Sequence, residues 1–158
     1  MKKASPGSGR RTCGSIRVGL DVLPVARMAR LSRENPGIQD TIFTGRELLY
    51  CLGKRRSFEH LAARFAAKEA VLKALGSGLG QRMRWTDVEI VNGLLGRPVA
   101  RLYGEVEALA QRRGLRDLDV SISHTSELAM AQALAVCDVP RAPRRAPRKR
   151  RVRPAGGS

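Results

Sequence analysis

The segment FEHLAARFAAKEAVLKALG, residues 58–76, constrains the fold more than any other part of the sequence. It consists almost entirely of strong helix formers, and a glycine, Gly76, closes it. Ser57 is placed to cap its start. Small residues let another backbone or a ligand approach this helix closely, and they are Ala62, Ala63, Ala66, Ala67 and Ala70. We therefore expect a long helix packed against the rest of one domain.

Shorter patterned segments surround this helix. Alternation in residues 16–22 predicts a strand, and Pro24 begins a helix that ends near Glu34. Thr44 and Glu47 have the spacing of a capping box, which predicts another helix. The second half predicts strands at 86–91 and 97–102, a helix at 104–113, and strands at 117–125 and 128–136, although the alanines of the last also suit a helix. This order does not alternate strictly, which favours an α+β fold with a mixed or antiparallel sheet.

Most of the formal net charge of +16 lies near the two ends of the 158-residue chain. Residues 1–15 contain four basic residues and no acid, and residues 138–158 contain eight basic residues and one acid. We expect one domain at 16–137 between a flexible basic segment and a disordered Arg/Pro-rich tail. Non-specific nucleic-acid binding through these segments is the competing function. Salt-dependent DNA or RNA binding that disappears when 138–158 is deleted would favour it.

The apolar runs and the cysteines of the sequence indicate the cellular compartment. No apolar run is long enough to cross a bilayer, so we expect no membrane partner. The three cysteines are odd in number and lack metal-ligand spacing, which argues against a disulfide framework. Together these observations predict a cytoplasmic protein.

Charged pairs on the long helix offer the first candidates for chemistry. Glu69 and Lys73 lie four residues apart and project from one face. Taken alone, they form a surface ion pair that contributes ~0.3–0.5 kcal/mol. Arg64 and Lys68 form a second polar pair around the side.

Strand ends and one loop add further candidates. Asp21 closes the first strand, where it either caps the next helix or belongs to a site. By alternation His124 points with Val120 and Ile122, whereas His60 has no partner in sequence and is interpreted as structural. The glycine-rich loop 76–80 either presents N–H groups to a phosphate or is a flexible connection. As a set, two acids, a lysine, a histidine and this loop suit a divalent metal bound to a pyrophosphate.

Motifs spanning residues 16–136 identify a family when they are taken in order. They are VGLDV at 18–22, IFT at 42–44 with Glu47, RFAAKEA at 64–70, KALG at 73–76, WTDVE at 85–89, Asn92, GRP at 96–98 and SISHT at 121–125. In this combination the sequence resembles the holo-acyl-carrier-protein synthase family, the small bacterial 4′-phosphopantetheinyl transferases. A relative that has lost activity and only binds coenzyme A or a carrier is a weaker alternative, because the key acids, lysine and histidine are retained.

The resemblance implies a reaction and a set of roles. Coenzyme A would supply its 4′-phosphopantetheine arm to a serine of an apo acyl carrier protein, and adenosine 3′,5′-bisphosphate would leave. Asp21 and Glu69 would ligate Mg²⁺, and Glu69 or metal-bound water would be the general base. The other implied coenzyme contacts are Lys73 and His124, which would also be catalytic, with Thr125, Arg64, Gly76, Ser77 and Gly78.

The resemblance also implies a homotrimer with active sites between subunits. The arginines Arg27, Arg30 and Arg33 then gain a role, because acyl carrier proteins are acidic and a basic helix face would steer them in.

Overall fold

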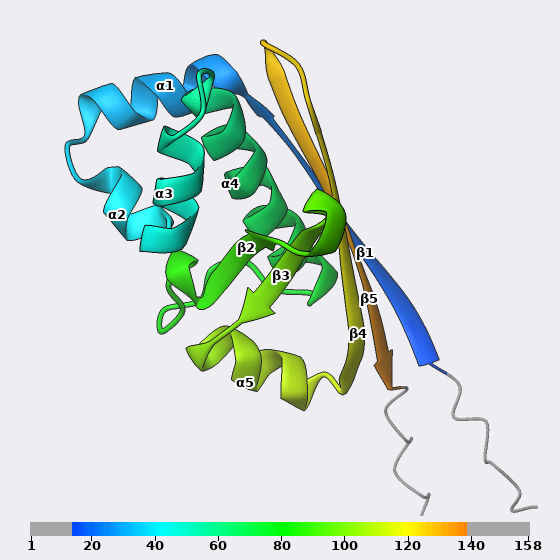
Figure 1. Ribbon diagram of the computed structural model, residues 1–158. Helices are drawn as coiled ribbons and strands as arrows, with labels where there is room; N and C mark the ends of the chain where they lie inside the picture. Colours follow the sequence, from blue (N-terminus) through cyan, green and yellow to red (C-terminus); the bar gives the residue numbers. More distant parts are fainter. Residues whose placement is uncertain (1–13, 139–158) are drawn as a thin grey trace, which may run out of the picture.

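The computed structural model describes residues 14–138 and combines helices with antiparallel sheets, which confirms the α+β prediction (Figure 1). The elements in chain order are β1 (Gly14–Pro24), α1 (Val25–Glu34), α2 (Ile38–Ile42), α3 (Gly45–Leu52), α4 (Ser57–Ala74), β2 (Val88–Asn92), β3 (Pro98–Leu102), α5 (Gly104–Arg112), β4 (Leu115–His124) and β5 (Leu128–Asp138). Two short 3₁₀ turns, Trp85–Asp87 and Leu94–Gly96, flank β2.

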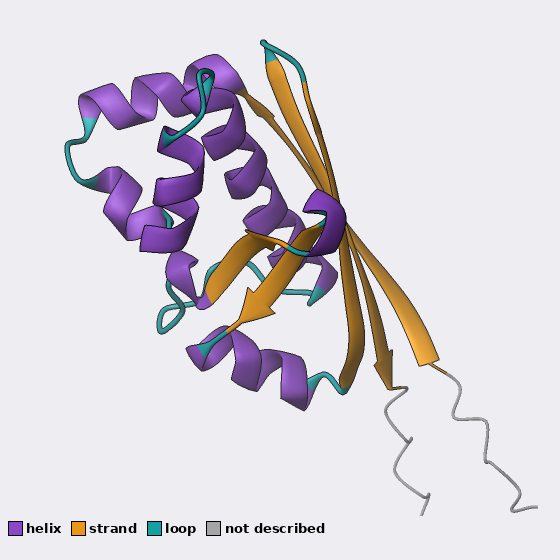
Figure 2. Cartoon of the chain, in the orientation of Figure 1, coloured by secondary structure: helices purple, strands orange, loops and turns teal. Residues whose placement is uncertain are grey.

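The strands form two antiparallel sheets. One is a long sheet in the order β1-β5-β4, and the other is the hairpin β2-β3. The helices lie on one side of the long sheet, and α4 runs along its face (Figure 2). Because β5 is the central strand, the two ends of the described chain meet in one sheet, with Gly14 opposite Asp138.

The contact between α4 and the long sheet depends on residues without bulky side chains. Every second residue of β5 is buried, at Ala129, Ala131, Ala133, Ala135 and Cys137, which resolves the helix-or-strand alternative in favour of a strand. Gly19 of β1 lies against α4 so closely that an added Cβ would sit 1.9 Å from the carbonyl oxygen of Ala70. The sheet can therefore approach the helix backbone directly.

A buried ion pair ties α4 to α3 and β2. Lys68 Nζ lies 2.8 Å from Glu47 Oε2, and both side chains are fully buried. The same ammonium donates to the carbonyl oxygens of Trp85, at 3.0 Å, and Val88. Glu47 Oε1 accepts the N–H of Ile90 at 2.9 Å. The prediction that Lys68 forms a polar pair on the side of the helix is therefore wrong.

The helix ends test the capping predictions. The capping box of Thr44 and Glu47 is confirmed, since Glu47 accepts the Thr44 N–H and Thr44 Oγ1 accepts the Glu47 N–H. Gly76 follows α4 with φ 71°, a conformation that glycine adopts without strain. Ser57 does not cap α4: it is the first helical residue, and no side chain caps this end. The five-residue helix α2 was not predicted, because it is too short to show helical periodicity.

The strands extend past the expected domain boundaries. Gly14 and Ser15 belong to β1 and Asp138 belongs to β5, because the β1-β5 ladder continues to these residues. The remainder of the two predicted basic segments lies outside the described residues. Within residues 14–138, no helix has the length and apolar character needed to cross a membrane.

Candidate active site

The first charged cluster lies where β1 crosses the C-terminal half of α4. Lys73 Nζ lies 2.7 Å from Asp21 Oδ1 and also donates to the carbonyl oxygen of Leu20 at 3.0 Å. Among the ion pairs of residues 14–138, Lys73 therefore pairs with Asp21 and not with Glu69. Asp21 does not cap α1, since Pro24 precedes that helix and no side chain caps it. The simpler interpretations, an ion pair between Glu69 and Lys73 and a helix cap by Asp21, are thus wrong.

Glu69 completes this cluster. Partial burial raises the pKa of the Glu69 carboxyl above its ordinary value, and the nearby Asp21 carboxylate raises it further. The cations Lys73 and Arg27 act in the opposite direction. The two carboxylates therefore repel each other, with Lys73 and Arg27 offsetting part of that repulsion, and a divalent cation would offset it further.

The cluster supplies few metal ligands. Within the described part of the chain, no group of three or more His, Cys, Asp or Glu side chains is placed to hold a metal ion. The donor set at this site is two carboxylates. Such a pair fits Mg²⁺, which commonly takes one or two carboxylates from the protein and its other ligands from phosphates and water.

A second cluster surrounds the start of α4. His124 Nδ1 lies 3.3 Å from Glu59 Oε2, and the His124 ring meets the His60 ring edge-on with centroids 5.0 Å apart. This places His124 on the α4 side of the sheet, as strand alternation predicts. The ring of Tyr50 contacts His60 from the other side, at 5.8 Å between centroids.

Arg64 lies on the buried side of this cluster, against Tyr50. Its guanidinium stacks over the Tyr50 ring at 4.0 Å, and Nη2 donates to Asn92 Oδ1 at 3.1 Å. The residue is only 5% exposed, and its Nε has no hydrogen-bond partner among residues 14–138. Arg64 is therefore not part of a surface pair with Lys68.

The two clusters do not meet within one chain. Glu59 and Glu69 are ten residues apart on α4, which is about 15 Å at 1.5 Å per residue. His124 lies beside Glu59, whereas Asp21 and Lys73 lie near Glu69. The predicted set of two acids, lysine and histidine is thus split into two groups on one subunit.

The backbone of the predicted phosphate loop is partly committed to ending α4. The N–H of Gly76 bonds the Lys73 carbonyl oxygen, at 2.9 Å, and the N–H of Ser77 bonds that of Leu72, at 3.0 Å. These two N–H groups are therefore not free for a phosphate, and of the two interpretations of the loop they favour a connection that ends the helix. Ser77 Oγ donates to the carbonyl oxygen of Gly78 at 2.7 Å.

Thr125 shapes the turn between β4 and β5. Its Oγ1 accepts the N–H groups of Glu127 and Leu128, at 3.2 and 3.1 Å. This closed turn fixes the strand end that carries His124.

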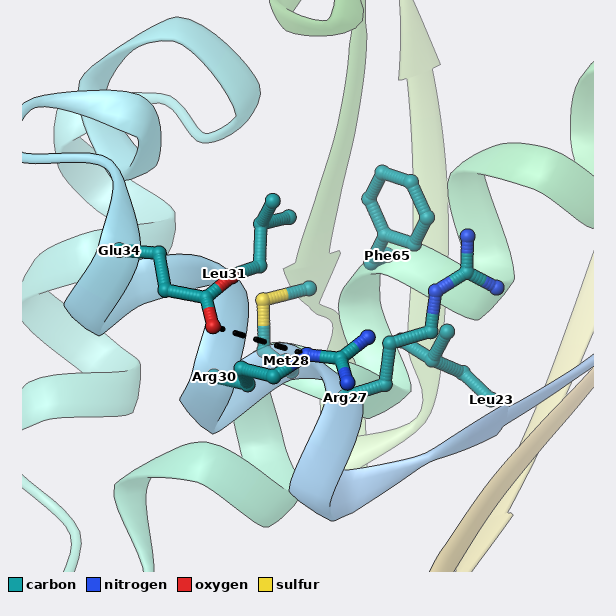
Figure 3. Close-up of a pocket in the computed structure, with 7 residues that line it drawn as sticks. All are labelled: Leu23, Arg27, Met28, Arg30, Leu31, Glu34 and Phe65. Carbon is teal, nitrogen blue, oxygen red and sulfur yellow. Dashed lines mark ion pairs between the residues drawn. The ribbon is translucent and has the colours of Figure 1, made fainter.

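A pocket of about 240 Å³ lies between α1 and α4 (Figure 3). Apolar side chains of Leu23, Met28, Leu31 and Phe65 line it together with Arg27, Arg30 and Glu34. Of the three arginines predicted to share one face, two line this pocket. Arg33 is exposed and is not among the lining residues.

Besides Glu59, the second cluster contains Tyr50, Lys54 and His60, which were not predicted as site residues. Lys54 places its ammonium 4.6 Å from the centre of the Tyr50 ring. The basic run Lys54, Arg55 and Arg56 directly before α4 was the available signal, but nothing in the sequence shows that it lies beside His124.

Comparison with known proteins assigns the family. Residues 17–137 match the family model of the 4′-phosphopantetheinyl transferase superfamily. The chain belongs to this superfamily. The match covers both charged clusters and the pocket between α1 and α4.

Relatives within the superfamily share most of the chain. The holo-[acyl-carrier-protein] synthase of Geobacter sulfurreducens is 46% identical over 123 residues, which are 77% of this chain and 96% of that protein. The enzyme of the same name from Streptomyces avermitilis is 44% identical over 120 residues, which are 76% of this chain and 96% of that protein.

Solved structures share the fold. The ACPS–CoA complex from Chronobacterium ammoniagenes aligns with a TM-score of 0.70 and 28% identity, over 79% of this chain and 98% of that one. The holo-(acyl-carrier-protein) synthase of Bacillus anthracis in complex with CoA (3′,5′-ADP) gives 0.65 and 27%, over 80% of this chain and all of that one.

Proposed function

We propose that this chain transfers the 4′-phosphopantetheine arm of coenzyme A to a serine of an apo acyl carrier protein. One observation carries the proposal: β1 and α4 bring Asp21 and Glu69 together beside Lys73, in a chain of the 4′-phosphopantetheinyl transferase superfamily. The relatives named holo-[acyl-carrier-protein] synthase and the coenzyme-bound structures agree with this reaction.

Asp21 and Glu69 would hold Mg²⁺. The raised pKa of the Glu69 carboxyl, caused first by burial and then by the Asp21 carboxylate, supports a cation at this place. When bound, Mg²⁺ lowers the charge of the coenzyme's pyrophosphate and makes its phosphorus easier to attack.

The residues of the chain itself orient the substrates and move a proton. The serine oxygen forms a bond to the phosphorus next to the pantetheine, and the bond from that phosphorus to the bridging oxygen breaks. Lys73, half exposed, would contact the phosphates and balance charge on the departing adenosine 3′,5′-bisphosphate. Glu69 or metal-bound water would accept the serine proton.

The second cluster would bind the nucleotide end of the coenzyme. Arg64 would supply a cationic group and His124 a ring nitrogen for its phosphates, with Thr125 beside them. The loop residues Gly76, Ser77 and Gly78 would contact the coenzyme near the first cluster, through groups other than the two N–H groups that end α4.

We further propose a homotrimer in which one subunit's first cluster faces another subunit's second cluster. The distance between the two clusters on one chain supports this arrangement. So does the outer face of the long sheet, which leaves large apolar side chains exposed, Ile16 by 68%. The others on β1 and β5 are Val18, Leu20, Val22, Leu128, Met130 and Leu134. Mixing inactive Glu69→Gln and His124→Ala subunits should restore part of the activity if the sites are shared, and none if they are not.

The pocket between α1 and α4 would receive the carrier. Its apolar lining suits a carrier side chain, and Arg27 and Arg30 suit the acidic surface around it, with Arg33 adding long-range charge. We also propose a cytoplasmic location, which the buried free thiols of Cys51 and Cys137 support.

The experiment that tests the proposed function is a transfer assay. The full chain is incubated with coenzyme A, Mg²⁺ and a panel of apo acyl carrier proteins, and each carrier is weighed by intact mass spectrometry. We expect one carrier to gain one phosphopantetheine group on its serine, with release of adenosine 3′,5′-bisphosphate. No gain on any carrier contradicts the proposal.

A further inference from the structure

His60 is the one imidazole of the second cluster to which neither the sequence nor the proposed function gives a role. It lies one turn before Arg64 on α4, and its ring lies between those of His124 and Tyr50. The side chain is only partly buried. His60 is therefore accessible to a ligand that also reaches His124.

The groups that face His60 come from α3, the loop after it, α4 and β4. They are Tyr50, Lys54, Glu59, Arg64 and His124. Two are permanent cations, and Glu59 is already engaged with His124 at 3.3 Å. Tyr50 holds both cations in place, since Lys54 and Arg64 each lie over its ring. The surroundings of His60 are thus net positive and suit an anion.

This environment disfavours the charged form of His60 in the free protein. Burial lowers the pKa of the His60 imidazole below its ordinary value, and the positive groups of His124, Arg64 and Lys54 lower it further. Only Glu59 acts in the opposite direction. A bound phosphate would place two negative charges among the same groups and reverse the balance, so that the protonated imidazole becomes favourable.

We propose that His60 is a further binding residue for a phosphate group of the nucleotide, and that it takes up a proton from solvent when that phosphate binds. Protonated His60 then donates a charge-assisted hydrogen bond beside His124 and Arg64. This inference rests on the proposed function, because it assigns the second cluster to the coenzyme's phosphates. It adds a residue and a proton to that site.

The test uses adenosine 3′,5′-bisphosphate, the nucleotide product, and the full chain. Calorimetric titrations at about pH 7 in buffers of different ionisation enthalpy measure the number of protons taken up on binding. His60→Phe keeps a ring between Tyr50 and His124 but cannot be protonated, and His60→Gln serves if that variant does not fold. Tyr50→Phe is the matched control, since it keeps the ring that holds the two cations.

We expect wild type and Tyr50→Phe to take up more protons than His60→Phe, by as much as one per site. The ratio of the wild-type Kd to the His60→Phe Kd should rise about fivefold between pH ~6 and ~8, within the limit of one linked proton. Titration of the ligand's own phosphates is common to both proteins and cancels in this ratio.

Three results would overturn the inference. Equal proton uptake in wild type and His60→Phe removes His60 from the site. Uptake that persists in His60→Phe and disappears in His124→Phe places the proton on His124. Absence of any nucleotide binding to wild type contradicts the proposed function itself, whereas tight binding without the His60 effect contradicts this inference alone.

Discussion

Lys68 and Glu69 are consecutive residues of α4, yet their surroundings are opposite. Lys68 is fully buried and pairs with Glu47 at 2.8 Å, so its charge is compensated inside the protein. Glu69 is partly exposed and has Asp21, a like charge, as well as the cations Lys73 and Arg27 around it, so its carboxylate is not taken up by one buried partner. The charge of Lys68 therefore stabilises the fold, whereas the charge of Glu69 is available to a ligand. The buried pair also orients α4, and through it Glu69.

The largest expected effect comes from Glu69→Gln. Removing one of two proposed metal ligands should lower kcat by roughly a thousandfold or more, an effect typical of losing one charge-stabilising group. The fold should survive, because the substitution relieves repulsion with Asp21. Steady-state transfer assays and urea unfolding of the same preparation check both statements. Near-normal turnover would remove Glu69 from its proposed role.

Lys68→Met removes the buried ion pair. It leaves Glu47 buried without its partner and should cost about 3–5 kcal/mol of unfolding free energy. Replacing both residues, in Lys68→Met/Glu47→Leu, should recover part of this loss, because neither partner of the pair is then left as an uncompensated buried charge. Urea unfolding of the two single variants and the double variant measures the coupling. A double variant no more stable than Lys68→Met would show that the pair is not the reason for the loss.

Gly19→Ala tests the close approach of β1 to α4, on which the position of Asp21 depends. The new Cβ would overlap the Ala70 carbonyl oxygen, so we expect a loss of about 1–3 kcal/mol from overpacking. Gly45→Ala is the matched control, since nothing lies within 4 Å of its added Cβ. Thermal unfolding compares them. Equal stability of the two variants would contradict the tight packing.

Arg30→Glu tests the charge at the pocket between α1 and α4, where Arg30 is one of the lining residues. If the pocket between α1 and α4 receives an acidic carrier, the reversed charge should raise the carrier's KM about tenfold and leave the KM for coenzyme A unchanged. The effect should shrink at high salt. A parallel rise in both KM values would point to general damage instead.

Glu34→Gln is expected to have the smallest effect. Glu34 lies 4.0 Å from Arg30 in an exposed pair, so its loss should change the unfolding free energy by only ~0.3–0.5 kcal/mol. Thermal unfolding at low and high salt measures it. A loss above 1 kcal/mol would show that this pair is not the ordinary surface pair its exposure indicates.

Local patterns predicted most of the fold but not the environment of the charges. The capping box at Thr44, the long helix with Gly76 at its end, and the strand alternation around His124 all depend on neighbours in sequence, and all are confirmed. The partners of Lys68 and Lys73 could not be predicted, because they lie 21 and 52 residues away and are set by tertiary packing. Spacing alone paired Lys68 with Arg64 and Lys73 with Glu69.

The site itself was predicted as a list of residues and not as an arrangement. Motif order selected Asp21, Glu69, Lys73 and His124, and the structure brings the first three together. Motif order could not show that His124, at the end of β4, lies beside Glu59, ten residues before Glu69 on α4. Strand order within the sheet decides that position. The ring cluster around His60 was missed for the same reason.

The most direct test of the account is a calorimetric titration of Mg²⁺ into the full chain saturated with coenzyme A. We predict binding in wild type and in Lys68→Arg, and loss of that binding in both Asp21→Asn and Glu69→Gln. Unchanged Mg²⁺ binding in the two carboxylate variants would contradict the claim that these acids form the reactive centre.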